Sequence, residues 1–340
     1  MKTTLTLFSA ILLIAIAGCE PGIEGKKPLL EKKNLLTVKF QQGQTLEYKF
    51  VSSRDIEVNW GPTKRGSKTG PDKVDKSSES MDMVVAYTPI KEDSNGLTTI
   101  KATCKSVHVR RTSSKTNIRG ASRDAVENLP GTSFTFTVEP TGKIVDYSQL
   151  EKLTKEIGEK AFRPEDKRGR IKEPDMISDF IATQWFLWDS ISSMEETAKK
   201  VHMGQSWKSK LSVPTPMVTR KARDVTYTLD EIRKTEKGEI AVIRSSYSHA
   251  ESIPANWPPL PYSGSFQMRG RFGFLRSYKL LDLQGQGEEL FNIDAGRTEQ
   301  YNQQYQAEIG ASFPMGISAN IKITIKQNLT MELLGTSLEN

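Results

Sequence analysis

Strict alternation of apolar and polar residues near the C-terminus is the feature that most constrains the fold. In residues 317–333 every second position is apolar except Gln327, and the positions between them are polar. One dry face and one wet face are typical of an antiparallel strand in a sheet that is covered on one side. At about 3.4 Å per residue the run would reach roughly 55 Å. It predicts either one long, curved strand or a strand that is broken or bulged near Gln327.

The same period of two recurs along most of the chain. Near the N-terminus, one face would carry Val38, Phe40, Leu46, Tyr48, Phe50, Ile56, Val58 and Trp60. Further strands are expected at Met81–Thr88, Leu97–Val109, Ser133–Val138, Val225–Leu229, Glu239–Tyr247, Ser265–Leu275 and Thr298–Ile309. We expect the Gly-, Lys- and Ser-rich residues 61–80 to form a polar loop. Strands joined by short polar turns predict a mainly β, antiparallel fold.

One region has the period of a helix instead. Ser148-Gln149-Leu150-Glu151 fits a capping box that would start a helix running to about residue 161. A second helix is expected from Asp175 to about Asp189, with a stripe formed by Ile177, Phe180, Ile181, Gln184 and Trp188. The sequence therefore predicts a helical segment around residues 148–200.

Short motifs recur in the two β-rich parts in the same order. Gly43-Gln44-Thr45-Leu46 is matched by Gly204-Gln205-Ser206-Trp207, and FTVEPTGK at 136–143 is matched by FNIDAGR at 291–297. The recurrence predicts two related β-sheet units or one large curved sheet, a half-barrel. The expected organisation is an N-terminal β unit at 35–147, a helical connector at 148–200 and a C-terminal β unit at 201–340.

The first residues have the pattern of an export signal. The apolar run from Leu5 to Ala17 is too short to span a bilayer, which needs about 20 residues. Ile16-Ala17-Gly18-Cys19 resembles the lipobox of bacterial lipoproteins. The resemblance implies a signal peptide at 1–18, a lipidated Cys19 carrying diacylglyceryl and palmitate, and a tether at 19–34. Because Glu20 is not the aspartate that retains lipoproteins at the inner membrane, a cell-envelope protein anchored in the outer membrane is favoured.

Several short motifs together resemble a known family. They are Gly43–Tyr48, Thr135–Val138 running into the Gly142 turn, Val201–Trp207 and Phe291–Arg297. With the lipobox, they are similar to a family of uncharacterised bacterial cell-envelope lipoproteins, a domain of unknown function. That resemblance implies a cellular location and a fold architecture, but it implies no known activity, cofactor or catalytic residue.

Cysteine content and charge narrow the possibilities. The chain has two cysteines, so a lipidated Cys19 leaves Cys104 without a disulfide partner. The fold must then be stabilised by its hydrophobic core without a disulfide. The net charge of +7 would attract an exported protein to a membrane or an anionic envelope polymer rather than to nucleic acid.

The sequence holds no recognisable catalytic motif. It lacks a Gly-x-Ser-x-Gly elbow, a His-Glu-x-x-His helix and a nucleotide-binding loop, and its three histidines are scattered. No catalytic residue, metal or cofactor is expected. The first hypothesis is a non-catalytic binding or interaction module that meets the membrane through Cys19 and an envelope protein or lipid through its fold.

The second hypothesis is a carrier of a lipid or another apolar ligand, and an unrecognised hydrolase is the third. A carrier would need an apolar cavity of some 300–1,000 Å³ within the curved sheet. The aromatic residues that could line it are Trp185, Trp188, Trp257 and Tyr262.

Overall fold

The structure is a computed structural model that describes residues 34–65, 68–113, 123–162, 176–194, 200–216, 221–253, 257, 275–312 and 321–338. Its elements in chain order are β1 (Asn34–Leu35), β2 (Gln44–Arg65), β3 (Lys68–Glu92), β4 (Thr98–Ser113), the 3-10 helix η1 (Ala125–Asn128), β5 (Ser133–Val138), β6 (Ile144–Asp146), α1 (Ser148–Phe162), α2 (Ile177–Phe186), α3 (Asp189–Ser192), β7 (Lys200–Val201), β8 (Ser206–Val213), β9 (Lys221–Thr235), β10 (Gly238–His249), β11 (Arg276–Asn292), β12 (Arg297–Ser312) and β13 (Ile321–Leu338).

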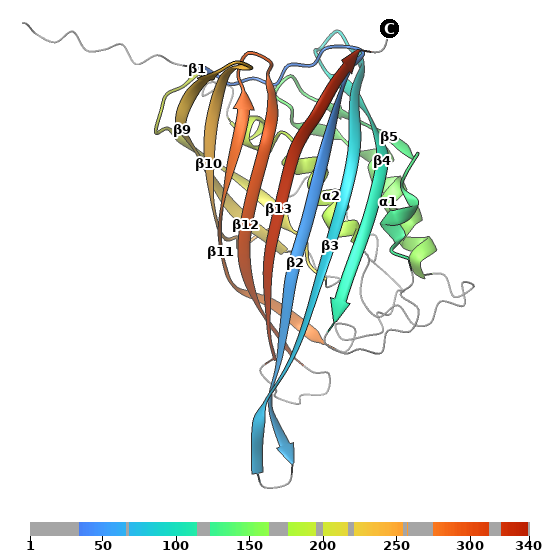
Figure 1. Cartoon of the computed structure of the whole chain (residues 1–340), viewed down its shortest axis with the longest axis vertical. Coiled ribbons are helices and arrows are strands. Elements are labelled where there is room, and N and C mark those ends of the chain that lie inside the picture. Colours follow the sequence, from blue (N-terminus) through green and yellow to red (C-terminus); the bar gives the residue numbers. More distant parts are fainter. Residues whose placement is uncertain are drawn as a thin grey trace, which may run out of the picture. The chain divides into compact units, whose positions relative to one another are not determined.

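The main body is one curved, antiparallel sheet, as the alternation predicts. Its eleven strands follow the order β6-β5-β4-β3-β2-β13-β12-β11-β10-β9-β8 (Figure 1), and β1 pairs separately with β7. The strands of residues 35–147 and of residues 201–340 form a single sheet because β13 pairs with β2 along its length, from Lys322–Asn59 to Leu338–Gln44.

Strand β13 runs without a break through Gln327, so the prediction of one long strand is confirmed. Buried and exposed residues alternate from Ile321 to Met331, and the register shifts only between Leu333 and Gly335. Gln327 is itself 2 % exposed. It stays on the buried side because a polar partner meets it there.

Two expectations for the long strands were wrong. Residues 61–80 are not a loop: β2 continues to Arg65, and β3 begins at Lys68 and pairs with both β2 and β4. The buried side chains described in this stretch, Asp75 and Glu79, are charged rather than apolar, and the Trp60 indole N–H donates to Asp75 at 2.8 Å. Strand β11 was not expected, because Gly285 and Gly287 interrupt its pattern of apolar residues.

Two further segments were expected to form strands. Residues 36–40 form no strand, although Leu36 and Val38 are buried. Of the strand expected at Ser265–Leu275, residues 265–274 lie outside the described ranges.

The helices cover one face of the sheet, called the inner face here, and the sheet curves around them (Figure 1). The predicted stripe of α2 is buried from Ile177 to Gln184. The start of α1 differs from the expected capping box. Ser148 is the first helical residue, and its N–H donates to the Asp146 carboxylate at 2.9 Å.

The repeated motifs close equivalent turns. Gly43 and Gly204 both have positive φ, +75° and +82°. The Gly43 N–H donates to Pro89 O on β3 at 3.0 Å, and the Gly204 N–H donates to Leu229 O on β9 at 2.7 Å. Aligning these turns makes β2 and β3 the counterparts of β8 and β9, which is the geometry that an internal duplication predicts.

Candidate functional site

A row of mostly polar residues crosses the apolar inner face from β10 to β4. Adjacent strands pair these residues directly, in the order Tyr247, Gly285, Tyr305, Gln327, Arg54, Glu79 and Arg111. We call this row the belt. Because buried polar groups need partners, the partners that each part of the belt has, or lacks, indicate what it does.

The belt separates two apolar regions of the inner face. The proximal apolar face includes Tyr48, Phe50, Met81, Met83, Val85, Tyr87, Leu329 and Met331. The distal apolar face consists of Ile56, Val58, Leu280, Leu283, Ala307, Ile309, Ile321, Ile323 and Ile325. Helix α2 packs on the proximal side, where Gln184 accepts a hydrogen bond from the Tyr87 hydroxyl at 2.8 Å.

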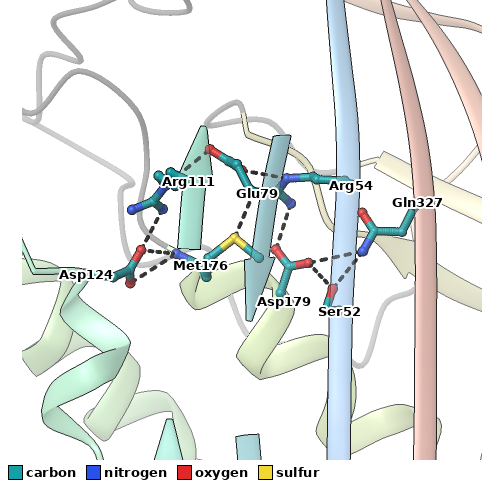
Figure 2. A network of polar contacts seen from close by, with 8 residues as sticks. All are labelled: Ser52, Arg54, Glu79, Arg111, Asp124, Met176, Asp179 and Gln327. Carbon is teal, nitrogen blue, oxygen red and sulfur yellow. Dashed lines mark hydrogen bonds and ion pairs between the residues drawn. The ribbon is translucent and has the colours of Figure 1, made fainter. Parts of the chain in front are cut away.

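One half of the belt is a network of paired charges that holds α2 (Figure 2), although Gln327 Oε1 in it has no hydrogen-bond partner. Arg54 donates to Glu79 and to Asp179 of α2, each at 2.7 Å. Asp179 also accepts a hydrogen bond from the Ser52 hydroxyl at 2.7 Å, and the Gln327 amide donates to Ser52 at 2.7 Å. The helix is therefore fixed to β2 and β13 through a single carboxylate.

The same network extends to the 3-10 helix η1. Arg111 contacts Glu79 at 3.3 Å and Asp124 at 2.5 Å, and Asp124 accepts the N–H of Met176 just before α2. Burial would raise the pKa of Glu79, but Arg54 and Arg111 together hold it below its ordinary value. These charges compensate one another, so this half of the belt is a structural clamp.

The other half of the belt surrounds an arginine that is not compensated. Arg223 of β9 is 0 % exposed, and its guanidinium lies 4.5 Å from the ring centroids of both Tyr247 and Tyr305 and 5.3 Å from that of Phe186. It donates through Nη2 to Gln303 Oε1. Among the described residues, Arg223 Nε, Arg223 Nη1, Gln303 Nε2 and the Tyr305 hydroxyl have no hydrogen-bond partner.

Two carboxyl groups near α3 have raised pKa values: Asp189, the half-buried first residue of that helix, and the buried Glu289 of β11. Asp189 accepts hydrogen bonds from the Tyr227 hydroxyl at 2.6 Å and from the Ser209 hydroxyl at 2.9 Å, and burial raises its pKa to about 6. Glu289 accepts a hydrogen bond from Thr298 at 2.6 Å, and burial raises its pKa to about 7. Both groups therefore titrate close to neutral pH.

Three of the four aromatic candidates line one small pocket. It measures about 210 Å³, and its walls include Trp185, Trp188 and Trp257. The pocket also touches Ile144 of β6 and Lys210 of β8, the two end strands of the sheet order. The tryptophans thus fill the space between the ends of the open sheet, in a pocket below the size expected for a carrier. Tyr262 lies outside the described residues.

Trp185 and Trp188 have different surroundings. Trp185 stacks on Trp257, with 4.9 Å between ring centroids. Trp188 packs in the aromatic core at 5.5 Å from Phe40 and 5.8 Å from Phe136. Trp188 therefore belongs to the core, whereas Trp185 and Trp257 form a stacked pair at its edge.

Larger hollows occur on the outer face of the sheet. One of about 720 Å³ is lined mostly by hydroxyl and amide side chains, including Thr228, Ser246, Gln286, Gln304 and Asn328. Such walls suit water and polar groups better than an apolar ligand.

The remaining sequence candidates do not come together. His108 and His249 are exposed, and His202 is half-buried on another element. Within the described ranges, no group of three or more His, Cys, Asp or Glu side chains could hold a metal ion. No helix in those ranges is long and apolar enough to cross a bilayer. Cys104 is buried and free, and burial raises its pKa to about 12.

The sequence analysis missed Arg223, Gln303 and Tyr305, which lie on two strands that are not adjacent in the sheet. The sequence does carry a signal for two of these residues. Gln303 and Tyr305 fall on the buried face of β12, where alternation alone would place apolar side chains. Arg54 shows the same signal on β2.

No protein-family model and no curated protein matches this chain. Among solved structures, it is similar to one titled "Lipid-protein interactions in lipovitellin", at 10 % sequence identity and a TM-score of 0.39. That similarity covers 89 % of this chain but only 26 % of the lipovitellin chain, so the chain spans about a quarter of that protein's length.

Proposed function

We propose that this chain is a lipoprotein of the bacterial cell envelope that binds a lipid-like ligand on the inner face of its sheet. Cys19 would anchor the chain, with the outer membrane favoured, and the folded part would act as a non-catalytic binding module. The observation that carries the proposal is the distal apolar face. The apolar lining of the sheet continues past the helices instead of ending where they end.

The dimensions of this face suit a long apolar chain. From Gln327 to Ile321, strand β13 extends over roughly 20 Å, and β2, β11 and β12 contribute apolar side chains beside it. Each buried methylene contributes about 0.8 kcal/mol, so about ten of them would contribute about 8 kcal/mol, from which the cost of association is subtracted.

The distal side chains are at most 4 % exposed. A ligand must therefore share or replace the cover that the chain itself gives them. The tryptophan pocket offers too little volume for a chain of this length, and the hollow of about 720 Å³ on the outer face has polar walls.

A pair of matched variants tests whether the distal face is a binding surface or ordinary core. Ala307, on the distal face, and Ala102, on β4 among the core residues, are both 0 % exposed. The full chain would be extracted from membranes in a mild detergent, and its bound apolar molecules identified by mass spectrometry. We expect an equimolar lipid-like ligand, which Ala307→Phe loses, with a smaller fall in the melting temperature of the ligand-free protein than Ala102→Phe causes.

Ala102→Phe should instead overpack the core, costing about 1–3 kcal/mol, and keep the ligand. If no ligand is found and Ala307→Phe destabilises as much as Ala102→Phe, the distal face is part of a closed core and the proposed function is wrong. The anchor is tested separately: palmitate labelling of cells should be lost in Cys19→Ala, and labelling that persists would contradict a lipidated Cys19.

A further inference from the structure

Arg223 is fully buried, yet most of its hydrogen-bonding capacity is unused. A guanidinium has five N–H donors, and in the described part of the chain only Nη2 has a hydrogen-bond acceptor, Gln303 Oε1. No carboxylate in that part lies within ion-pair distance of it. Cation–π contacts with Phe186, Tyr247 and Tyr305 offset part of the lost hydration, but they leave Nε and Nη1 without acceptors.

Two polar side chains next to Arg223 also carry hydrogen-bond donors without acceptors. Gln303 uses its carbonyl oxygen on Arg223, so the amide nitrogen is the group without a partner. The Tyr305 hydroxyl has no hydrogen-bond acceptor for its proton in the described part of the chain. Burial raises its pKa to about 12 although the neighbouring Arg223 acts in the opposite direction, so the hydroxyl stays protonated and can donate at neutral pH. Gln303 and Tyr305 are 4 % and 5 % exposed. Three side chains thus bring unused donors to one buried place.

An oxyanion is the chemical group that satisfies such a set. Arginine binds carboxylate and phosphate through parallel N–H···O bonds, and an amide N–H and a phenol O–H can complete the shell. We infer that Arg223, Gln303 and Tyr305 bind the carboxylate or phosphate head group of an amphipathic ligand. The inference deepens the proposed function and rests on it for the apolar part of that ligand.

The position of the cluster fits a ligand with a head and a tail. Tyr305 is in the belt, and the next inward residues of β12 are Ala307 and Ile309 of the distal apolar face. A head group held at Tyr305 would therefore place its chain along that face. Gly285, opposite Tyr305, leaves the space into which the tyrosine packs: a Cβ there would lie 2.4 Å from Tyr305 Cβ.

Asp189 does not take the place of the missing anion. Its charge interacts with Arg223, but this is the weakest of the four influences on the Asp189 pKa. Its two oxygens already accept hydrogen bonds from Ser209 and Tyr227.

Matched ligands separate the head-group site from the apolar face. The delipidated full chain would be titrated with palmitate, with the neutral 16-carbon alcohol, with a 16-carbon lysophosphatidate and with inorganic phosphate alone. Wild-type protein should bind palmitate or lysophosphatidate more tightly than the alcohol. Arg223→Gln should weaken binding of that anion by about 10- to 100-fold, the effect of losing charged hydrogen bonds, and leave the alcohol unchanged.

Each result bears on one of the two proposals. If neither the alcohol nor either lipid anion binds to wild type, the proposed function fails. If the alcohol binds but Arg223→Gln weakens no anion, the apolar face stands and the head-group site is refuted. A preference for palmitate or lysophosphatidate identifies the head group, and phosphate that competes with the preferred lipid shows that the site accepts the anion without a tail.

The melting temperature of each variant without ligand is the control for correct folding. Arg223→Gln removes a buried, uncompensated charge, so its melting temperature should equal or exceed that of wild type. Gln303→Met removes the amide donor and also the acceptor of Arg223 Nη2, keeps the arginine, and should weaken anion binding by about 3- to 10-fold. Gln303→Met also decides the matter if Arg223→Gln does not fold: unchanged anion affinity in it would refute the site.

Discussion

Removal of the Asp179 carboxylate should destabilise the fold by about 3–5 kcal/mol, the usual effect of deleting one partner of a buried ion pair. Asp179 is 0 % exposed and lies 2.7 Å from an Arg54 nitrogen and 2.7 Å from the Ser52 hydroxyl. With an effective dielectric constant of about 20 and charges about 4 Å apart, the ion pair alone contributes about 4 kcal/mol. In Asp179→Ala, Arg54 stays buried and keeps Glu79 as its carboxylate partner.

The assay is urea unfolding at neutral pH, followed by circular dichroism and tryptophan fluorescence. Trp185 lies in α2, so its emission reports on whether that helix stays docked. Asp82→Ala is the matched control, because Asp82 is 38 % exposed and pairs with Lys49 at 3.4 Å. An exposed pair of this kind contributes about 0–1 kcal/mol.

The reasoning is refuted if Asp179→Ala and Asp82→Ala lose the same free energy of unfolding. A second test removes both charges of the pair. Arg54→Met combined with Asp179→Leu leaves no uncompensated charge between them, so it should recover most of the stability lost in Asp179→Ala. A double variant that is less stable than the single one would show that Asp179 acts through another contact.

Gly142→Ala should lower the melting temperature more than Gly131→Ala. Both glycines have positive φ, but only at Gly142 would a new Cβ lie 3.0 Å from Trp188 Cβ. Equal falls in melting temperature would contradict this steric argument. Burial raises the pKa of Glu289 to about 7, so the folded protein holds a proton that the unfolded chain releases. The free energy of unfolding should therefore fall between about pH 4 and pH 7, and Glu289→Gln should flatten that fall in thermal melts; an unchanged slope would exclude Glu289 as its source. Cys104 should react with a thiol reagent only as the protein unfolds, so rapid labelling of native protein would contradict its burial.

Alternation predicted the sheet well because one face of each strand is buried against a common core. It also marked Gln327 as exceptional. The long strand forms, rather than a broken or bulged one, but alternation could not reveal the hydrogen-bond partners of Gln327. Its hydrogen-bond partner Ser52 is 275 residues away along the chain, and Asp179 is 148 residues away. A rule that considers one strand at a time treats an inward polar residue as an interruption, whereas here it belongs to a network across strands.

The strand at residues 68–80 was not predicted, for a related reason. Propensity and polarity both favour a loop there, but Ser78 and Glu79 lie between β2 and β4, which supply cross-strand partners on both sides. Pairing between strands far apart in sequence outweighed local preference. The aromatic candidates are a different case: Trp185, Trp188 and Trp257 line a hollow of only about 210 Å³, and their role as ligand contacts stays a prediction.

The two buried arginines have different surroundings. Arg54 and Arg223 both lie on the inner face and are at most 2 % exposed. Around Arg54 the fold supplies Glu79 and Asp179, so this chain does compensate a buried guanidinium where it serves packing. Around Arg223 the described part of the chain supplies aromatic rings, further donors and one amide oxygen, Gln303 Oε1, but no carboxylate within ion-pair distance. Packing alone would be served as well by an apolar residue of similar volume, so the acceptor that Arg223 lacks is best supplied by a ligand.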